Sequence, residues 1–456
     1  MNTSFFGEML NSITERGRAL LDRARDRRDV AAARSESLAD LCEELLSGRG
    51  EASGVALARE ILEKYADLTI GPRIAFFEAL STRFGPDRKR LEAAIAAWQA
   101  APSDRTAAEV HEAAEARRQE LLRRLNLAPG GTAALVRMRE QLLDALSHRK
   151  DLADVDADFV HLFSSWFNRG FLVLRRIDWA TPAMILEKII RYEAVHEIAS
   201  WDDLRRRIDP PDRHCYAFFH PALVDEPLIF VEVALTREIP DAVGPILAID
   251  RDAVPVDKTR TAVFYSISNC QRGLTGVSFG NFLIKQVVEE ISRELPKLQT
   301  YVTLSPAPDF ARWLDRERKT ENSKILSFED CEALKGLDHP DWWREPERYE
   351  AFKEPFLRAA AWYYLNARNR RGWPVDPVAR FHLGNGARLE RLNWLADLTE
   401  KGLAQSYGLM VNYLYDLDHI EQNHEAYAEG RRVVASNAVR RHLRGAAATD
   451  LVPAAV

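Results

Sequence analysis

Two polar residues near turns have the chemistry of a reactive site. His382 stands in the segment RFHLGNG, residues 380–386, and Ser305 lies between the apolar run 298–304 and Pro306. An imidazole exchanges protons near neutral pH, and a hydroxyl at a strand end can hold a carboxylate. The serine is not part of a G-x-S-x-G elbow, so we expect no acyl-serine intermediate.

We expect a helix to begin just after His382. Asn385 is a suitable N-cap for a helix that starts near Gly386. The positive end of that helix would favour an uncharged imidazole ring.

A glycine-bearing loop is the third chemical feature. Residues 261–268, TAVFYSIS, have the pattern of a buried strand, and Gly273, Gly276 and Gly280 follow where a backbone must approach a ligand closely. The next segment predicts an amphipathic helix whose N-terminus faces the loop and would favour a phosphate. Its apolar stripe consists of Phe282, Ile284, Val287, Val288 and Ile291. The loop is neither a dinucleotide fingerprint nor a P-loop, so taken alone it also fits an ordinary tight turn.

These features need a framework, and the pattern of the chain predicts one in two parts. Up to about residue 190 apolar residues recur at helical spacing, as in 38–46, 55–68 and 134–146. Later come a short helix, strand-like runs and a helical insertion rich in Trp and Tyr; the segment 242–249 is a third strand or a loop. These elements span residues 201–214, with a break at Pro210 and Pro211, and residues 215–236, 261–268, 298–305 and 310–374. We predict an α+β protein with a helical bundle domain, residues 1–190, suited to oligomerisation, and a catalytic domain, residues 191–456.

The composition of the 456 residues excludes several classes of protein. The net charge is −6, with 63 basic and 69 acidic residues mixed along the chain, which leaves no basic footprint for nucleic acid. No apolar run approaches the roughly 18 residues of a membrane span, and the N-terminus lacks a signal-peptide core. Cys42, Cys215, Cys270 and Cys331 are too scattered for a disulfide framework or a zinc site. We therefore expect a cytoplasmic protein without nucleic-acid or membrane partners.

Three long segments together resemble malonyl-CoA decarboxylase. They are VFYSISNCQRGLTGVSFGNFLIK from Val263, LSPAPDF from Leu304, and ARFHLGNGARLERLNWLADLTEKGLAQSYGLMVNYLYDL from Ala379. The resemblance implies an acetyltransferase-like mixed sheet, in which two neighbouring parallel strands splay apart and a thioester arm lies in the gap. It also implies conversion of malonyl-CoA to acetyl-CoA and carbon dioxide, no cofactor, and a homo-oligomer, either a dimer or a tetramer.

The resemblance also assigns site residues. His382 matches the family's catalytic histidine and would act as the acid, and Ser305 matches the active-site serine and would hold the carboxylate. Tyr415 and Asn412 match polar groups near the acyl pocket. The residues expected to bind substrate are Ser268, Gln271, Gly273, Leu274, Thr275, Gly276, Val277, Ser278 and Gly280. Ser278 departs from the pattern, since some relatives have a carboxylate there, which weakens any claim that an acid is essential at this point.

Two other functions fit the same features. One is an acyl-CoA-dependent N-acyltransferase, because the loop and fold are shared, and the other is a non-catalytic CoA-binding scaffold. We expect no metal site: His419 and His424 are five residues apart, off a common helical face, and their spacing matches no zinc pattern.

Overall fold

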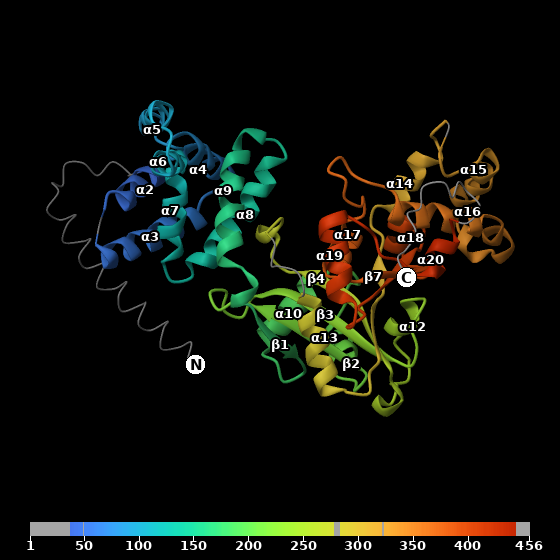
Figure 1. Cartoon of the computed structure of the whole chain (residues 1–456). Helices are drawn as coiled ribbons and strands as arrows, with labels where there is room; N and C mark the ends of the chain where they lie inside the picture. Colours follow the sequence, from blue (N-terminus) through green and yellow to red (C-terminus); the bar gives the residue numbers. More distant parts are fainter. Residues whose placement is uncertain (1–36, 49, 278–282, 322, 444–456) are drawn as a thin grey trace. The chain divides into compact units, whose positions relative to one another are not determined.

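The computed structural model describes residues 37–443 apart from residues 49, 278–282 and 322 (Figure 1). The chain forms two compact units. The first comprises the chain up to Leu172 with the loops His220–Val224 and Gln271–Phe279. The second comprises Val173–Phe219, Asp225–Cys270 and Gly280–Val456.

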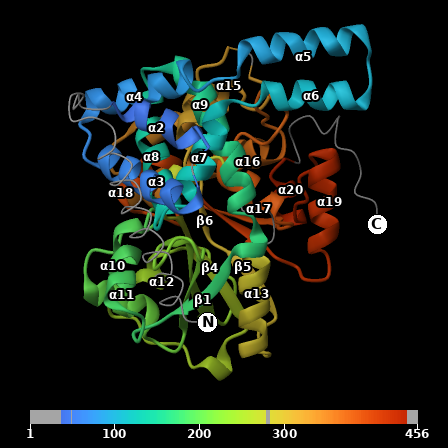
Figure 2. The ribbon, with the colours of Figure 1, turned by 90° about the vertical axis from the view of Figure 1, so that its left-hand side faces the viewer.

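The first unit is helical, as its apolar spacing predicts. Leu41, Leu57, Ile61, Leu135 and Leu142 are all buried in its core. Figure 2 shows α5 and α6 as a pair of neighbouring helices. The helices are α2 (Leu38–Leu46), α3 (Glu51–Ala66), α4 (Ile70–Thr82), α5 (Arg88–Ala100), α6 (Asp104–Ala114), α7 (Arg117–Asn126), α8 (Gly131–Leu146) and α9 (Ala153–Trp166), with the short turns η2 (Lys150–Leu152) and η3 (Arg169–Phe171).

The second unit is built on a mixed sheet in the order β1-β2-β3-β4-β5-β8-β6, with β7 paired to β8. The strands are β1 (Val173–Ile177), β2 (Arg213–Phe219), β3 (Pro227–Thr236), β4 (Thr261–Asn269), β5 (Thr300–Thr303), β6 (Ser305–Pro306), β7 (Arg388–Asn393) and β8 (Met410–Leu414). The strand-like runs of the sequence are therefore confirmed as β2 to β6. The ambiguous segment 242–249 contains the short helix α12 (Gly244–Leu247), with Pro245 in its first turn, where proline is tolerated.

Helices cover this sheet and form the predicted insertion. They are α10 (Ala183–Tyr192), α11 (Trp201–Ile208), α12, α13 (Leu283–Glu294), α14 (Phe310–Glu317), α15 (Phe328–Leu334), α16 (Pro346–Leu365), α17 (Pro377–Gly384), α18 (Glu400–Ser406), α19 (Ile420–Gly430) and α20 (Asn437–Arg441). Single turns are η4 (Val256–Lys258), η6 (Lys335–Asp338) and η7 (Trp342–Arg344). The stripe of α13 is buried as predicted, while Phe282 lies outside the described residues.

The second unit begins at Val173 and not near residue 190, because strand β1 pairs with β2 and because of the packing of helix α10. Its side chains Ile185, Leu186 and Ile189 share a buried cluster with Cys215 and Ala217 of strand β2. Because these apolar side chains need the sheet as their partner, α10 belongs to the sheet unit.

The parallel pair β4 and β5 separates partway along its length. Residues 261–264 of β4 pair with 300–303 of β5, and the Leu304 N–H donates to the Phe264 carbonyl at 2.9 Å. Beyond this point β4 continues to Asn269 beside β3, whereas β6 pairs with β8. The predicted splaying of two parallel strands is therefore present, and Ser305 lies directly after it.

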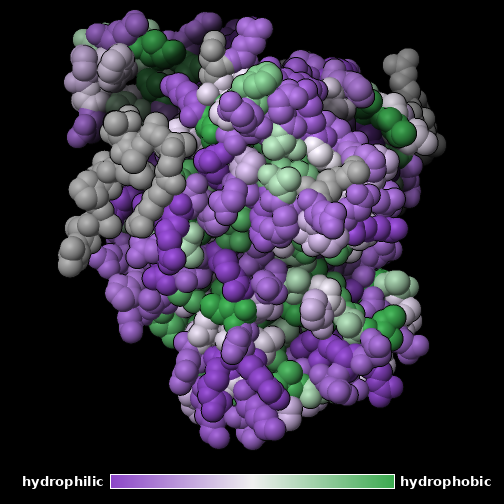
Figure 3. Space-filling view, turned by 90° about the vertical axis from the view of Figure 1, so that its right-hand side faces the viewer, coloured by the Kyte–Doolittle hydropathy of each residue, from purple (hydrophilic) through white to green (hydrophobic). Residues whose placement is uncertain are grey.

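The surface in Figure 3 is covered mostly by hydrophilic side chains, with apolar ones in smaller groups between them. Among the described residues, none of the helices has both the length and the apolar character needed to cross a bilayer.

Candidate active site

Helix α17 places His382 in its last turn. The helix begins at Pro377 after the N-cap Asp376, whose carboxylate accepts the Ala379 N–H at 2.7 Å. Proline is tolerated at the first helical position, because an N–H there would have no acceptor within the helix. Since the cap and the proline define the start of the helix, the imidazole is fixed five residues further along.

The expected helix start after His382 is wrong, because α17 ends there. Asn385 is the C-cap: its backbone N–H bonds to the carbonyls of Phe381 and His382. Gly386 then has a φ of +83°, and a Cβ on it would lie 2.3 Å from the Ile420 carbonyl oxygen. A glycine is required at this sharp, closely packed exit from the helix.

Ser305 and His382 meet although 77 residues separate them. Strand β6 pairs Ser305 with Val411 of β8, and the Ser305 hydroxyl lies 3.0 Å from His382 Nε2. The same hydroxyl donates to Thr303 Oγ1 at 2.8 Å. The tertiary fold therefore brings together the two residues singled out first in the sequence.

Tyr415 completes this chain of hydrogen bonds on the other side of the ring. Its hydroxyl lies 2.9 Å from His382 Nδ1, and its backbone N–H donates to the Tyr301 carbonyl at 2.8 Å. Because the single Ser305 proton points to Thr303, the serine accepts from Nε2–H. Nδ1 then accepts from the Tyr415 hydroxyl.

The site is buried and its histidine is uncharged. His382, Ser305 and Tyr415 expose only 2%, 5% and 1% of their surface. Burial lowers the pKa of His382 to about 3 and raises the pKa of Tyr415 well above its usual value. The ring also stacks on Tyr413, with centroids 4.6 Å apart. The ring is neutral, as we expected. The cause is desolvation by burial, whereas we had expected the positive end of a helix to be the cause.

Asn412 has other partners. Side chains alternate along a strand, so Asn412 points to the face of β8 opposite Tyr413 and Tyr415. Its amide nitrogen donates to the Thr303 carbonyl at 2.8 Å, and its amide oxygen accepts from Asn393 at 2.8 Å. The structure therefore brings Ser305, His382 and Tyr415 together, and uses Asn412 to hold strand β5.

The glycine loop belongs to the helical unit. The turn η5 (Arg272–Leu274) packs on α8: the Gly273 carbonyl accepts from Arg139 at 2.8 Å, and a Cβ on Gly273 would lie 2.0 Å from the Val136 carbonyl oxygen. A close backbone approach is thus real at Gly273, and the element approached is α8.

Other loop residues predicted to bind substrate differ in their exposure. Leu274 and Val277 are buried, Gln271 is half-buried, and Thr275 and Gly276 are exposed, with a φ of +79° at Gly276. Ser278 and Gly280 lie outside the described residues. The Thr275 and Val277 N–H groups donate to the Arg272 and Leu274 carbonyls, each at 3.0 Å, so within the described part of this turn Gly276 is the exposed residue that could offer its N–H to a ligand.

Ser268 has a structural use at the end of β4. Its buried hydroxyl accepts from the Ala194 N–H at 3.2 Å and donates to the Glu193 carboxylate at 3.3 Å. The same carboxylate accepts from the Ser266 hydroxyl at 2.8 Å. Ser268 therefore helps to anchor the loop before α11.

Sequence reasoning missed Thr303, Tyr413 and Asp376. Thr303 stands two residues before Ser305, and Tyr413 two residues before Tyr415, which is the spacing that places side chains on one face of a strand. That spacing was available as a signal. Asp376 before a proline is an N-cap signature of the helix that carries His382.

The region around His419 offers no metal centre in the described part of the chain, where no group of three or more potential ligands converges. His419 pairs with Asp416 at 3.0 Å, and His424 lies 2.8 Å from the Gly384 carbonyl.

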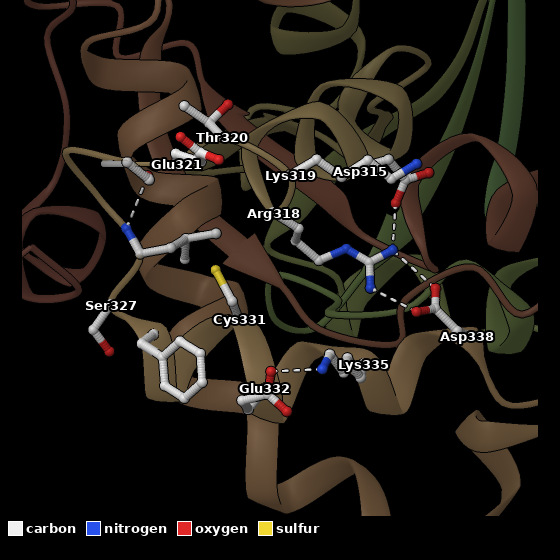
Figure 4. Close-up of a pocket in the computed structure, with 13 residues that line it drawn as sticks. Asp315, Arg318, Lys319, Thr320, Glu321, Ser327, Cys331, Glu332, Lys335 and Asp338 are labelled. Carbon is white, nitrogen blue, oxygen red and sulfur yellow. Dashed lines mark hydrogen bonds and ion pairs between the residues drawn. The ribbon is translucent and has the colours of Figure 1, made fainter.

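A separate pocket of about 950 Å³ lies between α14 and α15 (Figure 4). Its central cation, Arg318, is paired with Asp315 at 2.7 Å and with Asp338 at 2.9 Å. The lining contains neither Ser305 nor His382. We therefore take the buried hydrogen-bonded chain, and not this pocket, as the candidate active site.

The fold and the site together define an α+β enzyme with a buried, uncharged histidine–serine pair. Comparison with known proteins agrees. The model of the malonyl-CoA decarboxylase C-terminal domain matches residues 170–452, and that of the N-terminal domain matches residues 84–167. The mitochondrial malonyl-CoA decarboxylase of Anser anser anser is 35% identical over 416 residues, which cover 83% of this chain and 82% of the relative.

Solved structures give the same result. The malonyl-CoA decarboxylases of Rhodopseudomonas palustris and Agrobacterium vitis are 58% and 57% identical, with TM-scores of 0.86 and 0.85. Each comparison covers 89% of this chain, and 98% and 99% of the respective relative. The chain belongs to the malonyl-CoA decarboxylase family, a family of carboxy-lyases.

Proposed function

We propose that this protein converts malonyl-CoA to acetyl-CoA and carbon dioxide. The family supports the reaction, and one observation carries the assignment of the site: the buried 3.0 Å contact between the Ser305 hydroxyl and His382 Nε2. Both groups are uncharged and shielded from water, which suits a substrate whose negative charge must move during the reaction.

The substrate brings its own electron sink. The bond between C2 and the carboxylate breaks, its electron pair forms the enolate of the thioester, and carbon dioxide leaves. A proton then adds to C2 to give acetyl-CoA. No metal, biotin or pyridoxal is needed in principle, so the protein must orient the carboxylate, exclude water and deliver one proton.

Ser305 holds the malonyl carboxylate in this proposal. When substrate binds, the hydroxyl proton turns from Thr303 to the carboxylate, while the serine oxygen continues to accept from His382 Nε2–H. A neutral hydroxyl orients the group without the strong ionic attraction that would stabilise the charged ground state. Removal of water weakens the hydration of the carboxylate and favours its departure as neutral carbon dioxide.

His382 delivers the proton as a neutral ring. Because burial lowers its pKa to about 3, the imidazolium is scarce at neutral pH, and the proton comes from Nε2–H. Nδ1 simultaneously takes the Tyr415 proton across the 2.9 Å contact, which leaves a tyrosinate. Before the next turnover a proton from solvent is added to Nε2, and the Nδ1 proton returns to Tyr415. The ring changes tautomer and need not become charged, in keeping with the known use of neutral histidine beside a developing enolate.

In this proposal the exposed Gly276 binds a phosphate group of CoA through its backbone N–H. Support comes from its exposure, while the neighbouring Thr275 and Val277 N–H groups donate to the Arg272 and Leu274 carbonyls. The other residues predicted to bind substrate stay predictions: Ser268, Gln271, Gly273, Leu274, Thr275, Val277, Ser278 and Gly280.

The test is to incubate the pure protein with malonyl-CoA in the presence of a chelator and without added cofactor. We expect stoichiometric acetyl-CoA and carbon dioxide. Binding of CoA without any turnover would instead indicate the scaffold, and CoA release that depends on an added amine would indicate the N-acyltransferase.

Variants separate chemistry from binding. His382→Asn should lower kcat by about 10²- to 10⁴-fold, the usual contribution of a general acid, while CoA affinity stays nearly unchanged. Full activity in this variant would remove His382 from the mechanism and leave the overall reaction intact.

We also propose that the protein acts in the cytoplasm as a dimer or tetramer. Light scattering on the pure protein measures the mass directly, and a monomer at micromolar concentration would contradict the oligomer.

A further inference from the structure

We propose that Thr303 is a positioning residue that sets the direction of the Ser305 hydroxyl and, through it, the tautomer of His382. Its effect on turnover depends on the proposed function, whereas its effect on the tautomer does not.

Thr303 is held by hydrogen bonds through both its side chain and its backbone. It is fully buried at the end of β5, where its Oγ1 accepts the Tyr413 N–H at 3.2 Å and the Ser305 hydroxyl at 2.8 Å. A backbone N–H can only donate, so one lone pair of Oγ1 is committed to strand β8. The second lone pair of Oγ1 accepts the Ser305 proton.

A second contact holds the backbone of the same residue. The Thr303 carbonyl accepts from the Asn412 amide at 2.8 Å, and the Asn412 amide oxygen accepts from Arg391 Nε at 3.1 Å. Arg391 in turn donates to the Pro240 carbonyl at 2.7 Å. This network explains the buried Asn412, which the sequence associated with the acyl pocket, as a support for Thr303.

The consequence follows from counting protons. Ser305 has one hydroxyl proton, and while it points to Thr303, the serine oxygen can only accept from His382 Nε2–H. Nδ1 is then left to accept from Tyr415. Without an acceptor at position 303, the Ser305 proton turns to Nε2, and the ring proton moves to Nδ1.

This choice of tautomer matters for the reaction. In the first arrangement the acidic proton stands on Nε2, on the side of the ring that faces Ser305. In the second arrangement that nitrogen carries no proton to donate. A residue that never touches the substrate thus decides which side of the ring can act as an acid.

The first experiment measures the tautomer of His382 in the substrate-free protein by ¹⁵N NMR, with His382→Asn to assign the signal. We expect Nε2–H in the unaltered protein and in Thr303→Ser, and Nδ1–H in Thr303→Val, which keeps the shape and removes the hydroxyl. An Nε2–H signal in Thr303→Val would overturn the proposal.

The second experiment measures turnover of malonyl-CoA. Thr303→Val should lower kcat about tenfold to a hundredfold, the usual effect of losing a buried hydrogen-bond partner, with KM within about threefold. Thr303→Ser should stay within about threefold of the unaltered protein in kcat. Equal loss in Thr303→Ser and Thr303→Val would show a packing role only and overturn the proposal.

A matched control and a milder variant complete the design. Thr300→Val makes the same substitution on the same strand, at a position outside the hydrogen-bonded chain, and should change neither readout. If Thr303→Val does not fold, Thr303→Cys keeps the size with a weaker acceptor and should shift the tautomer partly toward Nδ1–H; an unchanged tautomer there would also overturn the proposal. If the unaltered protein releases no carbon dioxide, the proposed function fails, while the NMR result still decides the role of Thr303.

Discussion

His382 is an uncharged ring with one partner on each nitrogen. Ser305 occupies Nε2 and the Tyr415 hydroxyl occupies Nδ1, at 3.0 Å and 2.9 Å. A histidine in a dry site can move a proton from one nitrogen to the other without carrying a full positive charge in between. The account at this scale therefore depends on both hydrogen bonds.

Two tyrosines of one strand test the bond at Nδ1. Tyr415→Phe should lower kcat about tenfold to a hundredfold, because it removes the donor to Nδ1 and nothing else. Tyr413→Phe is the matched control: its ring also contacts His382, but its buried hydroxyl has no hydrogen-bond partner among the described residues. Steady-state kinetics should show a large effect for position 415 and a small one for position 413. Equal effects would argue against proton transfer through Tyr415.

The depressed pKa of His382 also predicts a pH dependence of stability. In the unfolded chain the His382 ring takes up a proton below pH 6.5, whereas in the folded protein burial keeps the ring unprotonated down to about pH 3. Stability from this group is therefore complete above pH 6.5 and lost as the pH falls, by about 1.4 kcal/mol for each pH unit. Urea unfolding at pH 7 and pH 5.5 should show this loss in the unaltered protein relative to His382→Asn. If the difference in unfolding free energy between the unaltered protein and His382→Asn is the same at both pH values, the ring is not desolvated.

How far the sequence predicts these residues depends on the kind of information they require. Motif resemblance identified His382, Ser305 and Tyr415, and the structure brings them together. Thr303 was missed because its role needs the backbone N–H of Tyr413, which comes from a strand more than a hundred residues away. The neutral ring was predicted for a wrong reason, since local sequence shows a possible cap at Asn385 but not the burial of the side chain.

At the scale of elements, two features position the site: the separation of β4 from β5, and the short helix α17. The first carries Ser305 away from β4 and onto β8. The second carries His382, and its start is fixed by Asp376, which also accepts a hydrogen bond from Tyr363 at 3.4 Å. A short helix gains little from its own hydrogen bonds, so its cap matters.

Removal of this cap should therefore affect activity as well as stability. Asp376→Ala should lower the free energy of unfolding by about 1–2 kcal/mol and reduce kcat, because α17 loses its N-cap and His382 its fixed place. Thr399→Ala removes the N-cap of α18, which carries none of the site residues, and should cost a similar stability with kcat unchanged. The free energy of unfolding and kcat are measured for both variants. A normal kcat in Asp376→Ala would show that α17 needs no cap to hold His382.

The isosteric variant of Asp376 separates charge from capping. Burial raises the pKa of Asp376 to about 6, so its ionised form is held in the folded protein at some cost at pH 7. Asp376→Asn keeps an acceptor for the Ala379 N–H without the charge. It should be at least as stable as the unaltered protein at pH 7 and retain its activity.

Element boundaries followed from the sequence where apolar periodicity was strong. The runs that became β2, β3 and β4 were recognised, whereas the segment of α12 could not be assigned because four residues carry too little periodicity. Helix α10 lies in the region up to about residue 190 that the sequence predicted to be helical. Its partner could not be predicted, since an apolar face looks the same whether it packs on helices or on a sheet.

At the scale of the whole molecule, the helical unit has a second role besides its predicted role in oligomerisation: it holds a loop that is predicted to bind CoA. The loop Gln271–Phe279 is counted with it, held by the contact of Gly273 with α8. The unit that was predicted to serve oligomerisation therefore also supports the loop that was predicted to bind CoA. The oligomeric state stays a prediction.

This arrangement predicts a defect that is confined to binding. In Gly273→Ala the new methyl group meets the Val136 carbonyl, so the loop must shift, and KM for malonyl-CoA should rise while kcat changes little. Gly54→Ala in α3 is the control in the same unit: it has open space around it and should raise stability by about 0.5–1 kcal/mol without affecting KM. An unchanged KM in Gly273→Ala would separate the loop from CoA binding.

The most direct test of the central claim is a crystal structure with a malonyl-CoA analogue in which a sulfonate replaces the carboxylate. We expect the sulfonate within hydrogen-bond distance of the Ser305 hydroxyl, with His382 Nε2 facing the adjacent carbon. An analogue whose anionic end binds out of reach of both residues would contradict the account.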